Sequence, residues 1–185
     1  MRSTRRVITG VDADGRSVFI SDEELEPVRP PLLGGVQILQ LFGEDAIPTV
    51  PNDGSMPDPL RFFPGNREAY RFMICSYPPA SAVSVPDDVE AATAETERLA
   101  PGILDLGPAA YKLHYTPSVD FIYVLGGEVT ITLDEGAKTV LRAGDCLMQC
   151  GARHQWGNEG EEWATFLCGA LGADIDESRH APVDG

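Results

Sequence analysis

Long apolar runs, cysteine motifs and an excess of positive charge are all missing from this sequence. No segment approaches the roughly 20 apolar residues of a membrane-spanning helix, and the N-terminal MRSTRRVITG has no apolar run of signal-peptide length. The four cysteines lack CxxC spacing, which argues against a zinc ribbon or a thioredoxin-like motif. The sequence has only 14 Lys and Arg residues but 29 Asp and Glu residues. The resulting net charge of -15 disfavours nucleic acid and anionic membranes as partners. We therefore expect a soluble protein in a reducing, cytoplasmic setting.

What is present favours one domain made of short strands. The 185 residues are 43% hydrophobic, enough to bury a core, and 19 Gly and 15 Pro residues favour strands joined by turns over long helices. Residues 5–20 predict a hairpin around an Asp/Gly turn. Residues 47–66, with five prolines, must be largely irregular. Residues 87–100 are either a short helix or a mobile acidic loop.

The whole chain is expected to be one structural domain in three parts. Residues 1–66 form an N-terminal extension with the hairpin, a strand over 33–42 and the Pro-rich loop. Residues 67–173 form a β-barrel that begins with a buried strand over 69–77. Residues 174–185 are a polar, solvated tail.

The Gly126-Gly127 pair is typical of a two-residue hairpin between FIYVL and EVTITL. A turn there pairs Val124 with Val129, Ile122 with Ile131 and Asp120 with Leu133. Strand alternation then places all six on the inner face. Asp120 becomes a carboxylate aimed into an apolar interior, where it requires a partner.

His114, on the preceding strand, is the candidate partner. A loop with an odd number of residues around Pro117 and Ser118 places His114 directly across from Asp120, whereas a two-residue turn would put Asp120 on the opposite face. Cross-strand neighbours have Cβ atoms roughly 5 Å apart, suitable for sharing one metal ion. The apolar pattern favours the odd register.

These residues resemble the two motifs of the cupin superfamily. The first motif resembles H114-Y-T-P-S-V-D120-F-I-Y-V-L-G126-G, and the second resembles G144-D-C-L-M-Q-C-G151-A-R-H154-Q-W-G-N158. Among cupins, the chain is similar to uncharacterised bacterial single-domain proteins with a long N-terminal extension. The resemblance implies an all-β, double-stranded β-helix or jelly-roll barrel. It also implies a metal site made by His114, Asp120 and His154.

The sequence departs from the cupin pattern at three positions. Thr116 replaces the second His of the first motif, Asp120 replaces the usual Glu, and Cys150 stands where Pro is common. Two His and one carboxylate suit the facial triad of non-haem iron enzymes, with coordination positions open for substrate or oxygen. Fe(II) is the first expectation, with Zn, Mn or Ni as alternatives.

Four further residues are candidate substrate-binding or supporting positions. Thr116 shares a strand face with His114 and is placed to support the metal or hold a water. Lys112 meets a substrate carboxylate or lies along the barrel rim. Gln149 precedes His154 near the expected opening, and Trp156 walls the pocket or packs in the core.

These residues predict a metal-dependent enzyme acting on a small organic molecule. The resemblance permits dioxygenase-type, isomerase, decarboxylase or lyase chemistry, and the open triad favours the dioxygenase type. The alternative is a non-catalytic cupin that binds or senses a small molecule. Phe121 and Tyr123 make their strand apolar on both faces, so we also expect a homodimer built through the sheets and the N-terminal segment.

Overall fold

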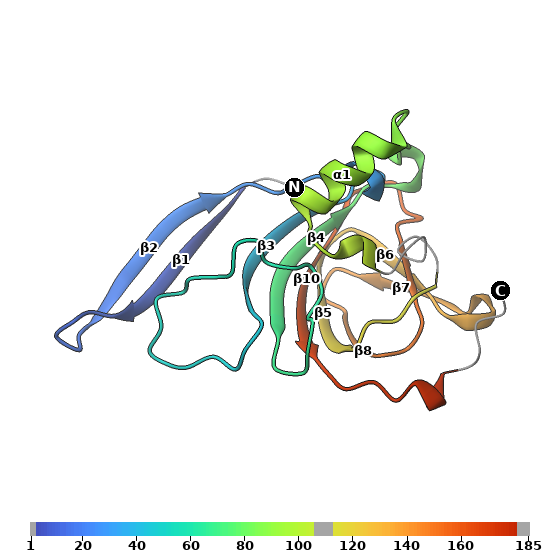
Figure 1. The fold of residues 1–185 in the computed structure, drawn as a ribbon. Coiled ribbons are helices and arrows are strands. Elements are labelled where there is room, and N and C mark those ends of the chain that lie inside the picture. Colours follow the sequence, from blue (N-terminus) through green and yellow to red (C-terminus); the bar gives the residue numbers. More distant parts are fainter. Residues whose placement is uncertain (1–2, 106–112, 181–185) are drawn as a thin grey trace.

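The computed structural model describes residues 3–105 and 113–180, which form ten strands in three antiparallel sheets, one α-helix and short 3-10 turns (Figure 1). The elements are β1 Thr4–Val11, β2 Ser17–Leu25, β3 Gln37–Glu44, β4 Tyr70–Tyr77, α1 Val89–Leu99, β5 Ser118–Gly126, β6 Glu128–Thr132, β7 Lys138–Arg142, β8 Cys146–Cys150, β9 Gln155–Gly157 and β10 Ala164–Gly172. Within the described ranges no helix is long and apolar enough to cross a bilayer. The cytoplasmic location stays a prediction.

The barrel is made of a five-stranded sheet, β3-β4-β10-β5-β8, and a three-stranded sheet, β7-β6-β9. Apolar side chains on the inner faces of both sheets make one core, including Ile38, Met73, Ile122, Val124, Val129 and Phe166. Two antiparallel sheets with alternating inward residues form the jelly-roll architecture, so the all-β prediction is confirmed. The strand β3, from the expected extension, pairs with β4 inside the larger sheet.

The predicted N-terminal hairpin is confirmed as β1–β2, whose strands pair from Thr4–Leu25 to Val11–Ser17. Its turn is closed by Asp12, whose Oδ1 accepts hydrogen bonds from the backbone N–H groups of Asp14 and Arg16. The hairpin projects away from the barrel (Figure 1).

The predicted hairpin between residues 120 and 133 is wrong. β5 pairs with β10 and β8, and β6 pairs with β7 and β9, so Val124 does not face Val129, nor Ile122 Ile131, nor Asp120 Leu133. Gly127 instead takes the chain from one sheet to the other with φ +70. A Cβ at Gly127 would lie 2.2 Å from the carbonyl oxygen of Trp163, so the glycine allows a close approach to the start of β10.

Although the predicted pairing is wrong, most of the residues that we predicted to face the core do so. Ile122, Val124, Val129 and Ile131 are at most 2% exposed, whereas Leu133, at 37%, lies outside the core. The chain crosses between the two sheets at Gly127, so both strands still bury one set of alternating residues.

The segment between β3 and β4 contains no helix or strand, as its prolines predict. It is tied to the sheet by Arg71, whose side chain is 1% exposed and pairs with Asp45 at 2.5 Å. The same guanidinium donates to the carbonyls of Arg61, Glu44 and Phe63. The loop is therefore held against β4.

The acidic segment 87–100 contains the helix α1, which settles the choice between helix and loop. Asp88 caps the helix by accepting a hydrogen bond from the backbone N–H of Ala91. Ala92 and Thr96 form its buried side, and the Thr96 hydroxyl accepts from the backbone N–H of Leu32. The helix thus packs on the chain segment that leads into β3.

The outer face of the five-stranded sheet is apolar and uncovered. We call it the outer apolar face; it consists of Phe72, Phe121, Tyr123, Leu125, Met148 and Leu171, each 43–51% exposed. The register places Phe72, Gly169, Phe121 and Met148 in one row across four strands. The hairpin does not cover this face within its own chain.

Candidate functional site

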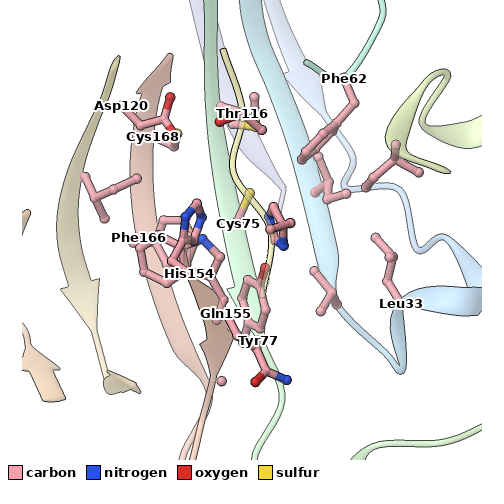
Figure 2. A pocket seen from close by; sticks show the side chains of 18 of the residues that line it. Leu33, Phe62, Cys75, Tyr77, Thr116, Asp120, His154, Gln155, Phe166 and Cys168 are labelled. Carbon is pink, nitrogen blue, oxygen red and sulfur yellow. The ribbon is translucent and has the colours of Figure 1, made fainter. Parts of the chain in front are cut away.

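A cavity of about 290 Å³ lies inside the barrel. Apolar and aromatic side chains dominate its wall, including Phe62, Met73, Tyr77, Ile103, Trp156 and Phe166. The polar groups that reach it include His114, Thr116, Ser118, Asp120, His154 and Asn158. All three predicted metal ligands therefore line one cavity, and Figure 2 shows two of them, Asp120 and His154.

The two histidines lie directly beside each other. His114 and His154 form an isolated antiparallel bridge with reciprocal backbone hydrogen bonds of 3.0 and 2.7 Å. A bridge of this kind directs both side chains to the same side, and the ring centroids are 4.7 Å apart. The structure thus brings together two predicted ligands that are 40 positions apart in the sequence.

Burial fixes the protonation of His154, which is 2% exposed. Desolvation lowers the pKa of His154 to about 4. The backbone hydrogen bond to Ala152 acts in the opposite direction and raises this pKa, whereas the charge of His114 lowers it further. The ring is therefore neutral at pH 7. Nδ1 lies 2.9 Å from the Ala152 carbonyl, and donation there leaves the lone pair on Nε2. A neutral imidazole held in this way is the form that binds a metal.

Gln149 supports His154 from β8 and is absent from the cavity wall. Its Nε2 lies 2.6 Å from the Ala152 carbonyl oxygen and 3.0 Å from Nδ1 of His154. When Nδ1 of His154 donates to the Ala152 carbonyl, the buried Gln149 amide donates to the same carbonyl oxygen and not to Nδ1, so it positions the ring through that shared acceptor. Its predicted supporting position agrees with this geometry, while contact with a ligand stays a prediction.

Asp120 occupies a different part of the cavity from the two histidines. The predicted cross-strand pairing of His114 with Asp120 is wrong: His114 bridges to His154, and Asp120 pairs with Gln149 and Ala170. The reason is that the chain enters the five-stranded sheet at Ser118, only after leaving the bridge to His154. Figure 2 shows Asp120 and His154 at different levels of the cavity.

The carboxyl group of Asp120 is incompletely paired. Its Oδ1 is buried with no hydrogen-bond partner. Burial raises its pKa, and a hydrogen bond with the Ser118 side chain acts in the opposite direction. Ser118 is in turn 2.7 Å from the Thr116 hydroxyl, so three polar residues form a chain along this wall.

The donor set fits a metal ion in part. His114 and His154 present two adjacent imidazoles, which suit a divalent transition metal. Over residues 3–105 and 113–180, however, no group of three or more His, Cys, Asp or Glu side chains is close enough to hold one ion. The three-ligand metal site stays a prediction, and any ion held by the two histidines would take its other ligands from water or substrate.

Comparison with known proteins agrees with this architecture. Residues 102–169 match the family model described as Cupin domain. This segment is similar to cupin domains. It contains β5 to β9, His114, His154 and Asp120, and these include the parts of the chain on which the resemblance depends.

Curated relatives of this chain come from fungi. The Phomopsin biosynthesis cluster protein D of Diaporthe leptostromiformis is 40% identical over 85 residues, which is 45% of this chain and 42% of that protein. The chain therefore spans less than half the length of that relative. The Cupin-domain-containing oxidoreductase srdB of Neurospora crassa is 28% identical over 163 residues, 88% of this chain and 69% of that protein.

A solved cupin structure is similar over most of the chain. The Cupin 2 conserved barrel domain protein from Salinispora arenicola CNS-205 is 16% identical, with a TM-score of 0.42, and the match covers 83% of this chain and 92% of that one. The narrower likeness to bacterial single-domain cupins stays a prediction.

The remaining predicted positions of the cupin site have different outcomes. Thr116 and Trp156 both line the cavity. Trp156 stacks on Phe166 at 5.1 Å and meets the His154 ring edge-on at 5.6 Å, so it both walls the pocket and packs in the core. Lys112 lies outside the described residues.

Sequence reasoning missed the wall that the extension contributes. Leu33, Phe62 and Phe63 line the cavity, although they precede the segment matched by the family model. The only signal was a pair of adjacent aromatic residues inside a Pro-rich loop, where a solvated segment rarely carries two. Tyr77, which stacks on Phe166 at 5.7 Å, was likewise read only as part of a buried strand.

Proposed function

We propose that this cupin is a metal-dependent enzyme that acts on a small, mainly apolar organic molecule bound in the barrel cavity. The observation that supports the proposal is the contact of two histidines, one of them fully buried and neutral, on the wall of a 290 Å³ cavity. Fe(II) is the first expectation for the metal, with Zn, Mn and Ni as alternatives.

The chain's own residues would bind, orient and shield the substrate. The Ala152 carbonyl and the Gln149 amide hold the His154 ring, and Trp156 packs against its edge. Apolar walls exclude water, which strengthens every polar interaction inside the cavity. A bound metal would supply Lewis acidity or oxygen activation at this position. We favour dioxygenase-type chemistry, in line with the oxidoreductase name of one relative.

The competing proposal is a cupin that binds a small molecule without transforming it. The observation in its favour is the lack of a three-ligand group among the residues that the structure describes. Two protein ligands hold a metal more weakly than three or four. Metal content therefore separates the two proposals.

The experiment is metal analysis of protein purified without a histidine tag after metal-supplemented expression. We expect about one metal per chain in the native protein, and less than about a tenth of that in His114→Ala and His154→Gln. His180→Ala is the matched control, because it removes the third histidine, which stacks on Tyr115 at 4.1 Å and is absent from the cavity wall. A native protein without metal would favour the competing proposal, in which the protein binds a small molecule without transforming it. Circular dichroism of each variant establishes that loss of metal is not loss of fold.

A further inference from the structure

The polar groups of the cavity are unequally distributed, and their charge points to a class of ligand. Over residues 3–105 and 113–180, the wall contains no Lys or Arg, and Asp120 is its one acidic residue. Among the lining residues that the structure describes, an anionic substrate would therefore find no positive side chain. A buried carboxyl group, by contrast, lacks a partner for one of its oxygens.

The unpaired oxygen is the feature that requires an explanation. Buried polar atoms in native proteins nearly always have a hydrogen-bond partner, and an exception indicates an absent ligand, ion or water. Asp120 Oδ1 is one of two such side-chain atoms among the described residues; the other, Ser21 Oγ, lies on the hairpin. Asp120 lines the cavity, so a cavity ligand can reach it.

The described structure shows no metal site that Asp120 shares with the two histidines. Asp120 belongs to no group of three potential ligands in the described part of the chain. The neighbours of Asp120 are Ser118, Gln149 on β8, Ala170 on β10 and the thiol of Cys168. Burial raises the pKa of the Cys168 thiol, and the charges of Cys75 and Asp120 raise it further. None of these side chains is a cation. Within residues 3–105 and 113–180, no Lys or Arg lines the cavity beside Asp120, so a cationic group of a ligand can fill this position.

We propose that Asp120 is the recognition group for the amine of a small ligand whose apolar body lies against the aromatic wall. The inference rests on the proposed function only in requiring that the cavity binds a ligand. An ammonium group donates a charge-assisted hydrogen bond to a carboxylate. The stack of Tyr77, Phe166 and Trp156 provides flat apolar surface for an aryl body. The net charge of -15 favours the approach of cations over anions.

The proposal assigns Asp120 and the histidines different tasks within one cavity. Thr116 and Ser118 continue the polar wall from Asp120 and can accept further ligand N–H or O–H groups. His154 lies at another level of the cavity (Figure 2), and with the adjacent His114 it would meet the part of the ligand that reacts. A ligand with a carboxylate or phosphate in place of the amine would be rejected by Asp120.

The test compares three probes of similar shape by calorimetry at pH 7: 2-phenylethylamine, 2-phenylethanol and 3-phenylpropionate. We expect the native protein to bind the amine at least about tenfold more tightly than the alcohol, since a hydrogen bond to a charged group contributes this much. The carboxylate should bind most weakly. Asp120→Asn should remove the preference, bringing the amine and the alcohol within about twofold of each other. Asp14→Asn, on the distant hairpin turn, makes the same change in net charge and should keep the preference.

Metal content of the same variants separates this inference from the proposed function. Asp120→Asn should retain the metal content of the native protein, whereas His154→Gln should lose metal and keep the preference for the amine. A preference for the amine in a protein without metal would leave the inference standing and remove the metal-dependent function. The inference is overturned by an amine that binds no tighter than the alcohol, by the failure of all three probes to bind, or by loss of metal in Asp120→Asn. Should Asp120→Asn not fold, Asp120→Ala replaces it in the same measurements.

Discussion

Replacing Gly127 with alanine should destabilise the barrel more than the same change at another glycine of similar backbone conformation. Gly127 has φ +70, and an alanine there adopts a left-handed conformation that costs about 1–2 kcal/mol. The added Cβ also lies 2.2 Å from the Trp163 carbonyl oxygen and 2.8 Å from the Ala164 Cα. Those are backbone atoms, so β10 must move. Relieving such overpacking costs about 1–3 kcal/mol more.

Gly136 is the matched control, because its φ is +76 and a Cβ there meets nothing within 4 Å. Gly136→Ala should therefore lose only the free energy that the left-handed backbone conformation costs, without the cost of a clash. Urea unfolding of both variants measures the difference, which we expect to be about 1–3 kcal/mol in free energy of unfolding. Equal losses in the two variants would refute the close approach of the sheet crossing to β10.

Three further predictions concern other parts of the molecule. In native protein at pH 8, only the two exposed cysteines of β8 should react with a thiol reagent, because Cys75 and Cys168 are buried and burial raises the pKa of Cys75 to about 12; rapid reaction of all four thiols would contradict this. Arg71→Met should lower the free energy of unfolding by about 3–5 kcal/mol, since it leaves buried carbonyls unpaired, whereas Arg142→Met, which breaks an exposed pair, should cost less than about 1 kcal/mol. We expect a homodimer through the outer apolar face, so light scattering at micromolar concentration should give twice 19.9 kDa, and Tyr123→Ser should lower that mass; a native mass near 19.9 kDa would end this prediction.

Local patterns predicted most of the elements because their causes are local. The Asp/Gly turn of the N-terminal hairpin, the prolines of the 47–66 loop and the capping Asp88 each act within a few residues. Strand alternation identified Ile122 and Val124 as core residues, because alternation depends only on the backbone of the strand itself.

Pairing was predicted poorly because it depends on residues far away in the sequence. Gly126-Gly127 has the composition of a tight turn, and nothing local reveals that the Trp163 carbonyl occupies the space beside Gly127. The same limit applies to the site. The resemblance predicts His114 and His154 as metal ligands. The expected partner of His114 across the strands was the nearer Asp120, whereas its observed neighbour, His154, is 40 residues away.

The cavity wall also bears on how such a protein acquires a new ligand during evolution. Leu33, Phe62 and Phe63 lie outside the segment that carries both histidines, yet they form part of the surface a ligand touches. Loop positions of this kind tolerate substitution better than paired strands do. After gene duplication, drift in the early part of the chain can therefore alter ligand preference while the histidine pair is left intact. Relatives that share only residues 102–169 need not share a substrate, and exchange of the 28–64 segment between two of them would transfer preference without transferring chemistry.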